Sequence, residues 1–230
     1  KMLSFTSSLS PDSEAFAVFV NDKYEYKGKK DALSENTIKK INSYLSVLKA
    51  KKKEEDISSF DISDKQKCFI IKVKNKHESF WPQENGGSFF SYLKNFKDLK
   101  KVDIYADSLN FEKDKLVSFF SQFLFGFNLK SYTFNKYKTL NKEKINKKID
   151  FKIISSNKEK IEKNYKYYNA IKEGVFLTRD LVSEPPNILN PKAYVKEIQK
   201  LSALGLKIKS YNEKELKKLG LNALLGVGQG

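Results

Sequence analysis

The chain has 230 residues, of which 40% are hydrophobic, and its formal net charge is +16. This composition suffices for one domain with its own core plus part of a second. A single cysteine, Cys68, excludes an internal disulfide framework and fits a reducing compartment. Polar residues interrupt the first twenty positions, and no stretch reaches the roughly 20 apolar residues of a membrane helix. We therefore expect a cytoplasmic protein with no membrane partner.

Lysine carries nearly all of the positive charge, because Arg179 is the only arginine. Proteins that read nucleic acids recruit arginine for its bidentate fork and its stacking plane. We therefore interpret the lysine excess as a coding bias spread over solvated faces. Binding to nucleic acid or to an anionic membrane surface stays the alternative.

The first third of the chain predicts three strands and a helix. Residues 3–9 and 15–20 form short strands, and the second is apolar almost throughout, which is typical of a strand inside a sheet. Ser34 is a suitable N-cap for a helix. Residues 49–56 form a charged connector, and residues 68–73 form the clearest central strand. The residues at helical spacing behind the N-cap are Ile38, Ile41, Leu45 and Leu48.

The middle of the chain continues to alternate strands with helices. Trp81-Pro82 predicts a turn, and Asn85-Gly86-Gly87 predicts a break before an apolar helix that runs to Lys97. Residues 102–105 and 151–154 are strands. Between the strands lies a strongly apolar helix, marked by Leu116, Phe119, Phe120, Phe123, Leu124 and Phe127. This alternation predicts an α/β layered domain, with a parallel or mixed sheet and flanking helices.

The last third begins with a long helix over residues 157–182, which carries one apolar face. Pro185-Pro186 ends it, because neither proline donates a backbone N–H. A new helix begins at Pro191 with Asn190 as N-cap. A strand at 206–211, a short helix at 213–219 and an apolar segment at 223–227 follow. We interpret this part as the truncated start of a second α/β domain.

Three blocks in the last third resemble the cytosolic leucyl aminopeptidases, a family of two-metal exopeptidases. They are Thr-Arg-Asp-Leu-Val-Ser-Glu-Pro-Pro-Asn-Ile-Leu-Asn-Pro at 178–191, Tyr-Asn-Glu-Lys-Glu-Leu-Lys-Lys-Leu-Gly at 211–220 and Ala-Leu-Leu-Gly-Val-Gly-Gln-Gly at 223–230. They stand in the family's order and spacing. The segment 123–139 also resembles the family. The resemblance implies an N-terminal α/β domain at 1–155, a linker helix at 156–184 and the incomplete opening of a catalytic domain at 185–230.

The resemblance further implies that the full-length parent is a metal-dependent aminopeptidase. It would release N-terminal amino acids from peptides with two divalent ions, zinc or manganese, and would assemble as a homo-hexamer. The family's metal-binding lysine, aspartates and glutamate have no match here. Its Asn-Thr-Asp-Ala-Glu-Gly-Arg segment has none either, since Arg179 belongs to the Thr-Arg-Asp-Leu block. We therefore expect no catalytic residue, no metal ligand and no bound metal in this chain, and an inactive 230-residue piece.

Other residues that carry chemistry are isolated from suitable partners. His77 lies in a polar run without clustered cysteines or carboxylates, so a metal site there is not favoured. Cys68 lies in an apolar strand, which indicates a buried, inert thiol. The Gly-x-Gly-x-Gly run at 226–230 lacks a following helix and fits a tight turn equally well. Asp180 and Glu184 are four residues apart on a helix and are expected to form salt bridges.

The best candidate for a nucleic-acid surface is the lysine-rich segment at 130–152, which holds eight lysines. Its aromatic residues could stack on bases while its lysines neutralise phosphates. We favour the other interpretation, a solvated connector whose aromatics pack against the sheet. A binding or scaffolding module, or a stand-alone domain from a split gene, remains an alternative function. The candidate contact residues are Lys130, Tyr132, Lys136, Tyr137 and Lys138.

Overall fold

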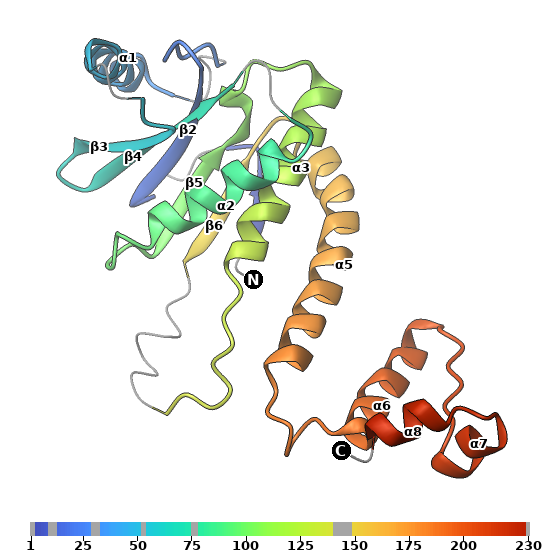
Figure 1. Ribbon diagram of the computed structural model, residues 1–230. Helices are drawn as coiled ribbons and strands as arrows, with labels where there is room; N and C mark the ends of the chain where they lie inside the picture. The colour runs from blue at the N-terminus through green and yellow to red at the C-terminus, as the bar shows by residue number, and fades with distance from the viewer. Residues whose placement is uncertain are drawn as a thin grey trace. The chain divides into compact units, whose positions relative to one another are not determined.

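A computed structural model of the chain describes residues 3–8, 13–28, 33–51, 54–74, 78–139 and 149–228 (Figure 1). The chain divides into two compact units, Lys1–Gly174 and Val175–Gly230. We describe each unit by itself. The helices in the described residues include no candidate membrane span.

The first unit is built on a six-stranded mixed sheet with the order β1-β6-β5-β2-β4-β3 (Figure 1). Neighbouring strands are parallel except β3 and β4, which are antiparallel. The predicted α/β fold is confirmed. The strands are β1 (Leu3–Thr6), β2 (Ala15–Asn21), β3 (Ile57–Ser63), β4 (Gln66–Val73), β5 (Lys101–Tyr105) and β6 (Asp150–Ile154).

Both faces of the sheet are covered by helices, which explains why β2 is apolar almost throughout. Successive side chains of a strand point to opposite faces, so each face needs its own apolar residues. Phe19 belongs to the core under α2 (Trp81–Leu93), α3 (Lys113–Lys130) and the start of α5 (Lys158–Ser183). Val18 belongs to the smaller core under α1 (Glu35–Ala50). A short helix, η2 (Ala106–Ser108), follows β5.

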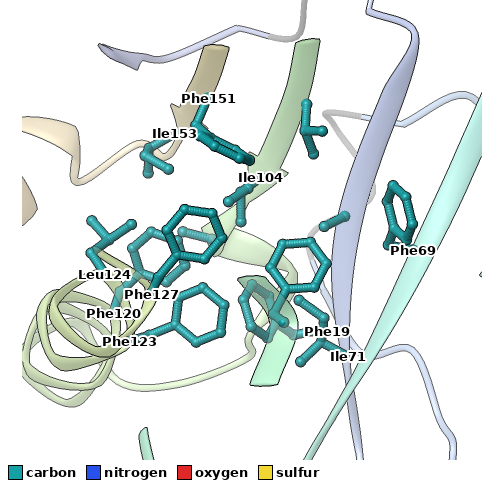
Figure 2. Close-up of a cluster of buried hydrophobic side chains, with 14 of the residues drawn as sticks. Phe19, Phe69, Ile71, Ile104, Phe120, Phe123, Leu124, Phe127, Phe151 and Ile153 are labelled. Atoms are coloured by element: carbon teal, nitrogen blue, oxygen red, sulfur yellow. The ribbon is translucent and has the colours of Figure 1, made fainter. Parts of the chain in front are cut away.

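Phenylalanine rings fill the larger core (Figure 2). Phe19 of β2 meets the rings of Phe120 and Phe123 edge-on, with centroids 5.8 and 5.3 Å away. Phe127 meets Phe151 of β6 edge-on at 4.6 Å. Such edge-on contacts suit the ring quadrupole and add about 0.5–1.5 kcal/mol each to the burial of apolar area. These rings fix α3 against the centre of the sheet.

The predicted break at Asn85-Gly86-Gly87 is wrong, because these residues lie inside α2. The predicted turn at Trp81-Pro82 is also wrong, since both residues stand in the first turn of the same helix, a position that tolerates proline. Gly86 lies where α2 and α3 cross at close distance. A Cβ atom on it would lie 2.0 Å from the carbonyl oxygen of Phe123 in α3, and one on Gly126 would lie 1.9 Å from the carbonyl oxygen of Gln83.

Two further strand predictions differ from the structure. β3 was not predicted, because this edge strand is largely polar and only Ser58 and Ile62 are buried in it. β1 ends at Thr6 rather than at residue 9, which lies outside the described residues. The helix behind Ser34, the strands at 15–20, 68–73, 102–105 and 151–154 and the apolar helix before residue 130 are confirmed.

Asp107 ties the end of β5 to the start of α5. Its carboxylate accepts a hydrogen bond from Ser155 Oγ and another, of 2.7 Å, from the backbone N–H of Ser156. Asp107 is buried, and a buried carboxylate needs such donors. The long helix predicted at 157–182 is confirmed as α5.

The second unit consists of short helices in the residues that the structure describes. They are α6 (Pro191–Gln199), η3 (Lys200–Leu204), α7 (Glu213–Lys218) and α8 (Asn222–Gly228). Asn190 caps α6 by accepting a hydrogen bond from Ala193 N, as predicted. The predicted strand at 206–211 is wrong, because no described strand of this unit is available to pair with it.

Candidate functional site

The lysine-rich segment is described over residues 130–139 and lies outside the described residues at 140–148. Lys130 is the last residue of α3, and Tyr132, Lys136, Tyr137 and Lys138 follow it in the loop. Lys136 Nζ lies 5.6 Å from the ring centroid of Tyr137, and the Phe134 ring lies 5.8 Å from the same ring.

Tyr137 keeps 49% of its surface exposed, and Lys136 and Lys138 are also exposed. Of the five predicted contact residues, the structure therefore brings Lys136 and Tyr137 together. An exposed aromatic ring beside two lysines is chemically suited to stack on a base and to approach a phosphate.

Sequence reasoning missed a hollow in the first unit, which we name the carboxyl-end hollow. It has a volume of about 250 Å³ and lies where β2 and β4 end, with the segment after β5 as its third wall. The strand order changes direction here, and ligands of α/β proteins bind at such points. The carboxyl-end hollow can be located only once β2 is known to pair with both β4 and β5. Its lining includes Phe19, Asn21, Lys23, Glu25, Lys27 and Ser108.

Hydrogen bonds fix the rim and the wall of the carboxyl-end hollow. Asn21 Oδ1 accepts from the backbone N–H groups of Lys23 and Glu25, at 3.0 and 2.8 Å. The Asn21 side-chain amide and the Lys27 ammonium, at 2.9 and 3.1 Å, lower the pKa of the Glu25 carboxyl. Ser108 Oγ accepts from Phe19 N at 2.8 Å and donates to the Tyr105 carbonyl. These groups suit binding, and they form no pair of nucleophile and base.

In the part of the chain that the structure describes, the remaining residues that carry chemistry lie in separate elements. Cys68 is fully buried, and this burial raises the pKa of its thiol well above the ordinary value, as expected for an inert thiol. Asp180 and Glu184 lie at and just beyond the end of α5. Gly226 and Gly228 lie inside α8 rather than in a turn, and His77 lies outside the described residues.

The described residues do not fit a two-metal centre. Nowhere in them do three or more histidine, cysteine, aspartate or glutamate side chains gather closely enough to hold a metal ion. A hydrolytic metal site takes three or more such ligands. We therefore assign no metal-dependent step to the described part of the chain.

Comparison with known proteins identifies a family model that matches the last 55 residues of the chain. Residues 176–230 match the family model described as the catalytic domain of the cytosol aminopeptidase family. This match begins in α5, runs through the two prolines and covers the three blocks on which the resemblance rests.

The curated relatives carry the name probable cytosol aminopeptidase. The protein of Agrobacterium fabrum is 42% identical over 138 residues, which are 59% of this chain and 27% of that protein. The protein of Phytoplasma mali is 40% identical over 148 residues, covering 63% and 29%. The protein of Phytoplasma australiense is 39% identical over 166 residues, covering 71% and 32%. The chain thus spans about a third or less of the length of these relatives.

Solved structures share the fold at low sequence identity. A mutant of tomato leucine aminopeptidase matches 95% of this chain and 46% of its own, with a TM-score of 0.72 and 15% identity. The bottromycin maturation enzyme BotP matches 91% of this chain and 41% of its own, with a TM-score of 0.60 and 14% identity. The same enzyme, in complex with Mn, gives the same TM-score.

Proposed function

We propose, because this chain belongs to the leucyl aminopeptidase family, that it forms the N-terminal part of a metallo-exopeptidase that releases N-terminal amino acids from peptides. The observation that carries the proposal is the match of residues 176–230 to the family's catalytic domain. The identity to the curated relatives and the shared fold support it.

Within this proposal the chain divides into an N-terminal α/β domain at 1–155, a linker helix at 156–184 and the opening of the catalytic domain at 185–230. The first unit supplies a closed core and the second supplies no catalytic group. The ligands of two divalent ions, zinc or manganese, belong to the polypeptide that follows this segment in the longer relatives. The Mn complex of BotP supports a metal requirement. The full-length parent is expected to be a cytoplasmic homo-hexamer.

The test compares two proteins. One is the 230-residue chain. The other is a fusion of it, at Gly230, to the part of the Phytoplasma australiense relative that follows the segment equivalent to residues 176–230. Turnover of leucine p-nitroanilide is measured with zinc or manganese added. We expect the fusion to turn over the substrate and the chain alone to be inactive. Activity that stays with the chain through several columns, or an inactive folded fusion, would contradict the proposal.

A second candidate function is nucleic-acid binding through the loop that contains Lys136, Tyr137 and Lys138. The exposure of the Tyr137 ring beside these lysines favours it over aromatics packed against the sheet. Contacts with phosphates release counterions, so the affinity must fall steeply with salt. A labelled single strand is titrated from low to near-physiological salt. Retention at the higher salt that Tyr137→Ala abolishes supports binding. Loss of all retention at that salt rejects it.

A further inference from the structure

The carboxyl-end hollow carries charges of both signs. Lys23, Glu25 and Lys27 come from the segment that follows β2, and all three line the hollow. In the described part of the chain, the Glu25 carboxylate is held through Oε2, which contacts the Asn21 side-chain amide at 2.9 Å and Lys27 Nζ at 3.1 Å. These contacts orient the carboxylate and leave Oε1 to receive a cationic group of a ligand. Lys23 supplies a cation for an anionic group.

The rest of the lining is largely apolar. Phe19, Val73 and Leu109 are buried and form part of the wall. The half-buried Phe111 adds an aromatic ring, which is fixed edge-on against Phe119 at 5.5 Å. The hollow of about 250 Å³ is smaller than the roughly 300–1,000 Å³ of sites for drug-sized ligands. Its size and lining therefore suit a small ligand with an aliphatic or aromatic group.

The backbone around Asn21 argues against a phosphate ligand. Phosphate sites in loops are built from successive backbone N–H groups that point at the anion. Here the N–H groups of Lys23 and Glu25 donate to Asn21 Oδ1, and that of Tyr24 donates to the Asn21 carbonyl at 3.0 Å. These three donors are used within the segment. The charges that remain for a ligand are those of the side chains.

The segment that carries these charges is fixed on both sides. Tyr24 takes a left-handed φ of 53°, and its hydroxyl is held by the backbone carbonyl and N–H of Glu55, each at 2.8 Å. A non-glycine residue keeps such a conformation only where its surroundings impose it. Gly28 lies against the opposite wall, because a Cβ atom on it would be 2.6 Å from Ser108 Cα. The charges are thus positioned before a ligand arrives, which lowers the cost of binding.

We propose that the carboxyl-end hollow binds a single hydrophobic amino acid, with its carboxylate on Lys23, its ammonium group on Glu25 and its side chain on the apolar wall. This inference goes beyond the proposed function, which is carried by residues 176–230, whereas the hollow lies in the first unit. The proposed function supplies a source of the ligand, because amino acids released from peptides are its products.

The experiment titrates L-leucine into the ¹⁵N-labelled 230-residue chain and follows the backbone amide signals. We expect saturable shifts at residues 19–27 and 108–111, with a Kd of about 1 mM or below. Two analogues test the charges: 4-methylpentanoate lacks the ammonium group, and 3-methylbutylamine lacks the carboxylate. Each should bind about fivefold or more weakly than leucine. Glycine should bind about tenfold or more weakly, because it buries no apolar side chain.

Three of the possible results would overturn the proposal. The first is the absence of saturable shifts at these residues, or shifts confined to other parts of the chain. The second is binding of 4-methylpentanoate or inorganic phosphate as tightly as leucine, which would make the hollow a general anion site. The third is binding of glycine as tightly as leucine, which would exclude the apolar wall.

Charge-removing variants assign the two contacts. Glu25→Gln should weaken leucine about three- to fivefold and leave 4-methylpentanoate unchanged, whereas Lys23→Gln should weaken both ligands by such a factor. The matched controls are Glu35→Gln and Lys39→Gln, which remove the same charges from exposed positions of α1 outside the lining. Both controls should bind leucine like the parent chain. Equal losses in the controls, or no loss in Glu25→Gln and Lys23→Gln, would overturn the assigned contacts.

These outcomes are independent of the proposed function, because the titration needs neither metal nor turnover. A chain that binds leucine in the hollow while the fusion is inactive supports the amino-acid site and contradicts the function. An active fusion built on a chain that does not bind leucine supports the function and overturns the site.

Discussion

Gly86 of α2 lies so close to Phe123 of α3 that a Cβ atom on Gly86 would be 2.0 Å from the Phe123 carbonyl oxygen. The neighbouring atoms are backbone, which moves only if the two helices separate. Separating them would open the phenylalanine core beneath (Figure 2).

Gly86→Ala should therefore destabilise the chain by at least about 2 kcal/mol, since overpacking a tight site costs about 1–3 kcal/mol or more. The matched control is Gly174→Ala in α5, where nothing lies within 4 Å of the added Cβ. There alanine should stabilise by roughly 0.5–1 kcal/mol through helix propensity. Urea unfolding followed by circular dichroism measures both. If the two variants shift the midpoint in the same direction, the close crossing is not what selects glycine at 86.

Because Tyr165 has a raised pKa, we expect the chain to lose stability at alkaline pH. Burial, followed by the nearby charge of Glu173, raises the pKa of its hydroxyl to about 12. The folded state thus favours the neutral phenol. Its contribution to stability is complete below the unfolded pKa of about 10 and declines as the pH rises from about 10 to about 12. Unfolding free energies measured across this range should fall, and Tyr165→Phe should fall less steeply. Identical slopes for the two proteins would contradict the assignment.

We expect the hydrogen bonds that Asp107 accepts between β5 and α5 to contribute to the stability of the chain. Asp107→Ala removes the acceptor of Ser156 N and of Ser155 Oγ, and an unsatisfied buried donor costs about 1–3 kcal/mol. Asp98→Ala, at an exposed aspartate, should change stability by less than about 0.5 kcal/mol. Thermal melts of both variants check this. A loss in Asp107→Ala no larger than that in Asp98→Ala would show that the junction does not depend on the carboxylate.

We expect the 230-residue chain and the fusion to respond differently to metal ions. Because the described residues bring no three candidate ligands together, zinc, manganese or a chelator should leave the melting temperature of the 230-residue chain unchanged. The fusion should lose leucine p-nitroanilide turnover in the chelator and regain it with added metal. A melting temperature of the chain alone that rises with equimolar metal would reveal a site in this chain.

The sequence predicted most of the sheet, because buried parallel strands are continuous apolar runs such as the one from Ala15 to Val20. It failed where the deciding partner is distant in sequence. Gly86 indicates a break until Phe123 is known to lie against it, and β3 looks too polar until it is paired with β4. Leu206 to Tyr211 shows the opposite failure, since the strand pattern is present without a described partner.

The candidate functional residues could likewise be predicted only in part from the sequence. The order of the blocks around Pro185-Pro186 indicates the family from the sequence alone, and residues 176–230, which contain these blocks, match the family's catalytic-domain model. The carboxyl-end hollow could not be found, because its walls come from β2, β4 and the segment after β5. Only the strand order brings Asn21 and Ser108 to one edge of the sheet.

The pairing of β1 with β6 sets a limit on when the first unit can be completed during synthesis. Leu3 of β1 pairs with Phe151 of β6, so β1 has no place in the sheet until β6 leaves the ribosome. At about 5–20 residues per second, roughly 7–30 s pass between the two. In the last part of this interval, from the synthesis of β5 to that of β6, the apolar edge of β5 is open to other chains. Nascent copies are therefore most prone to aggregate before β6 emerges, and a chaperone that binds translating ribosomes should raise the yield.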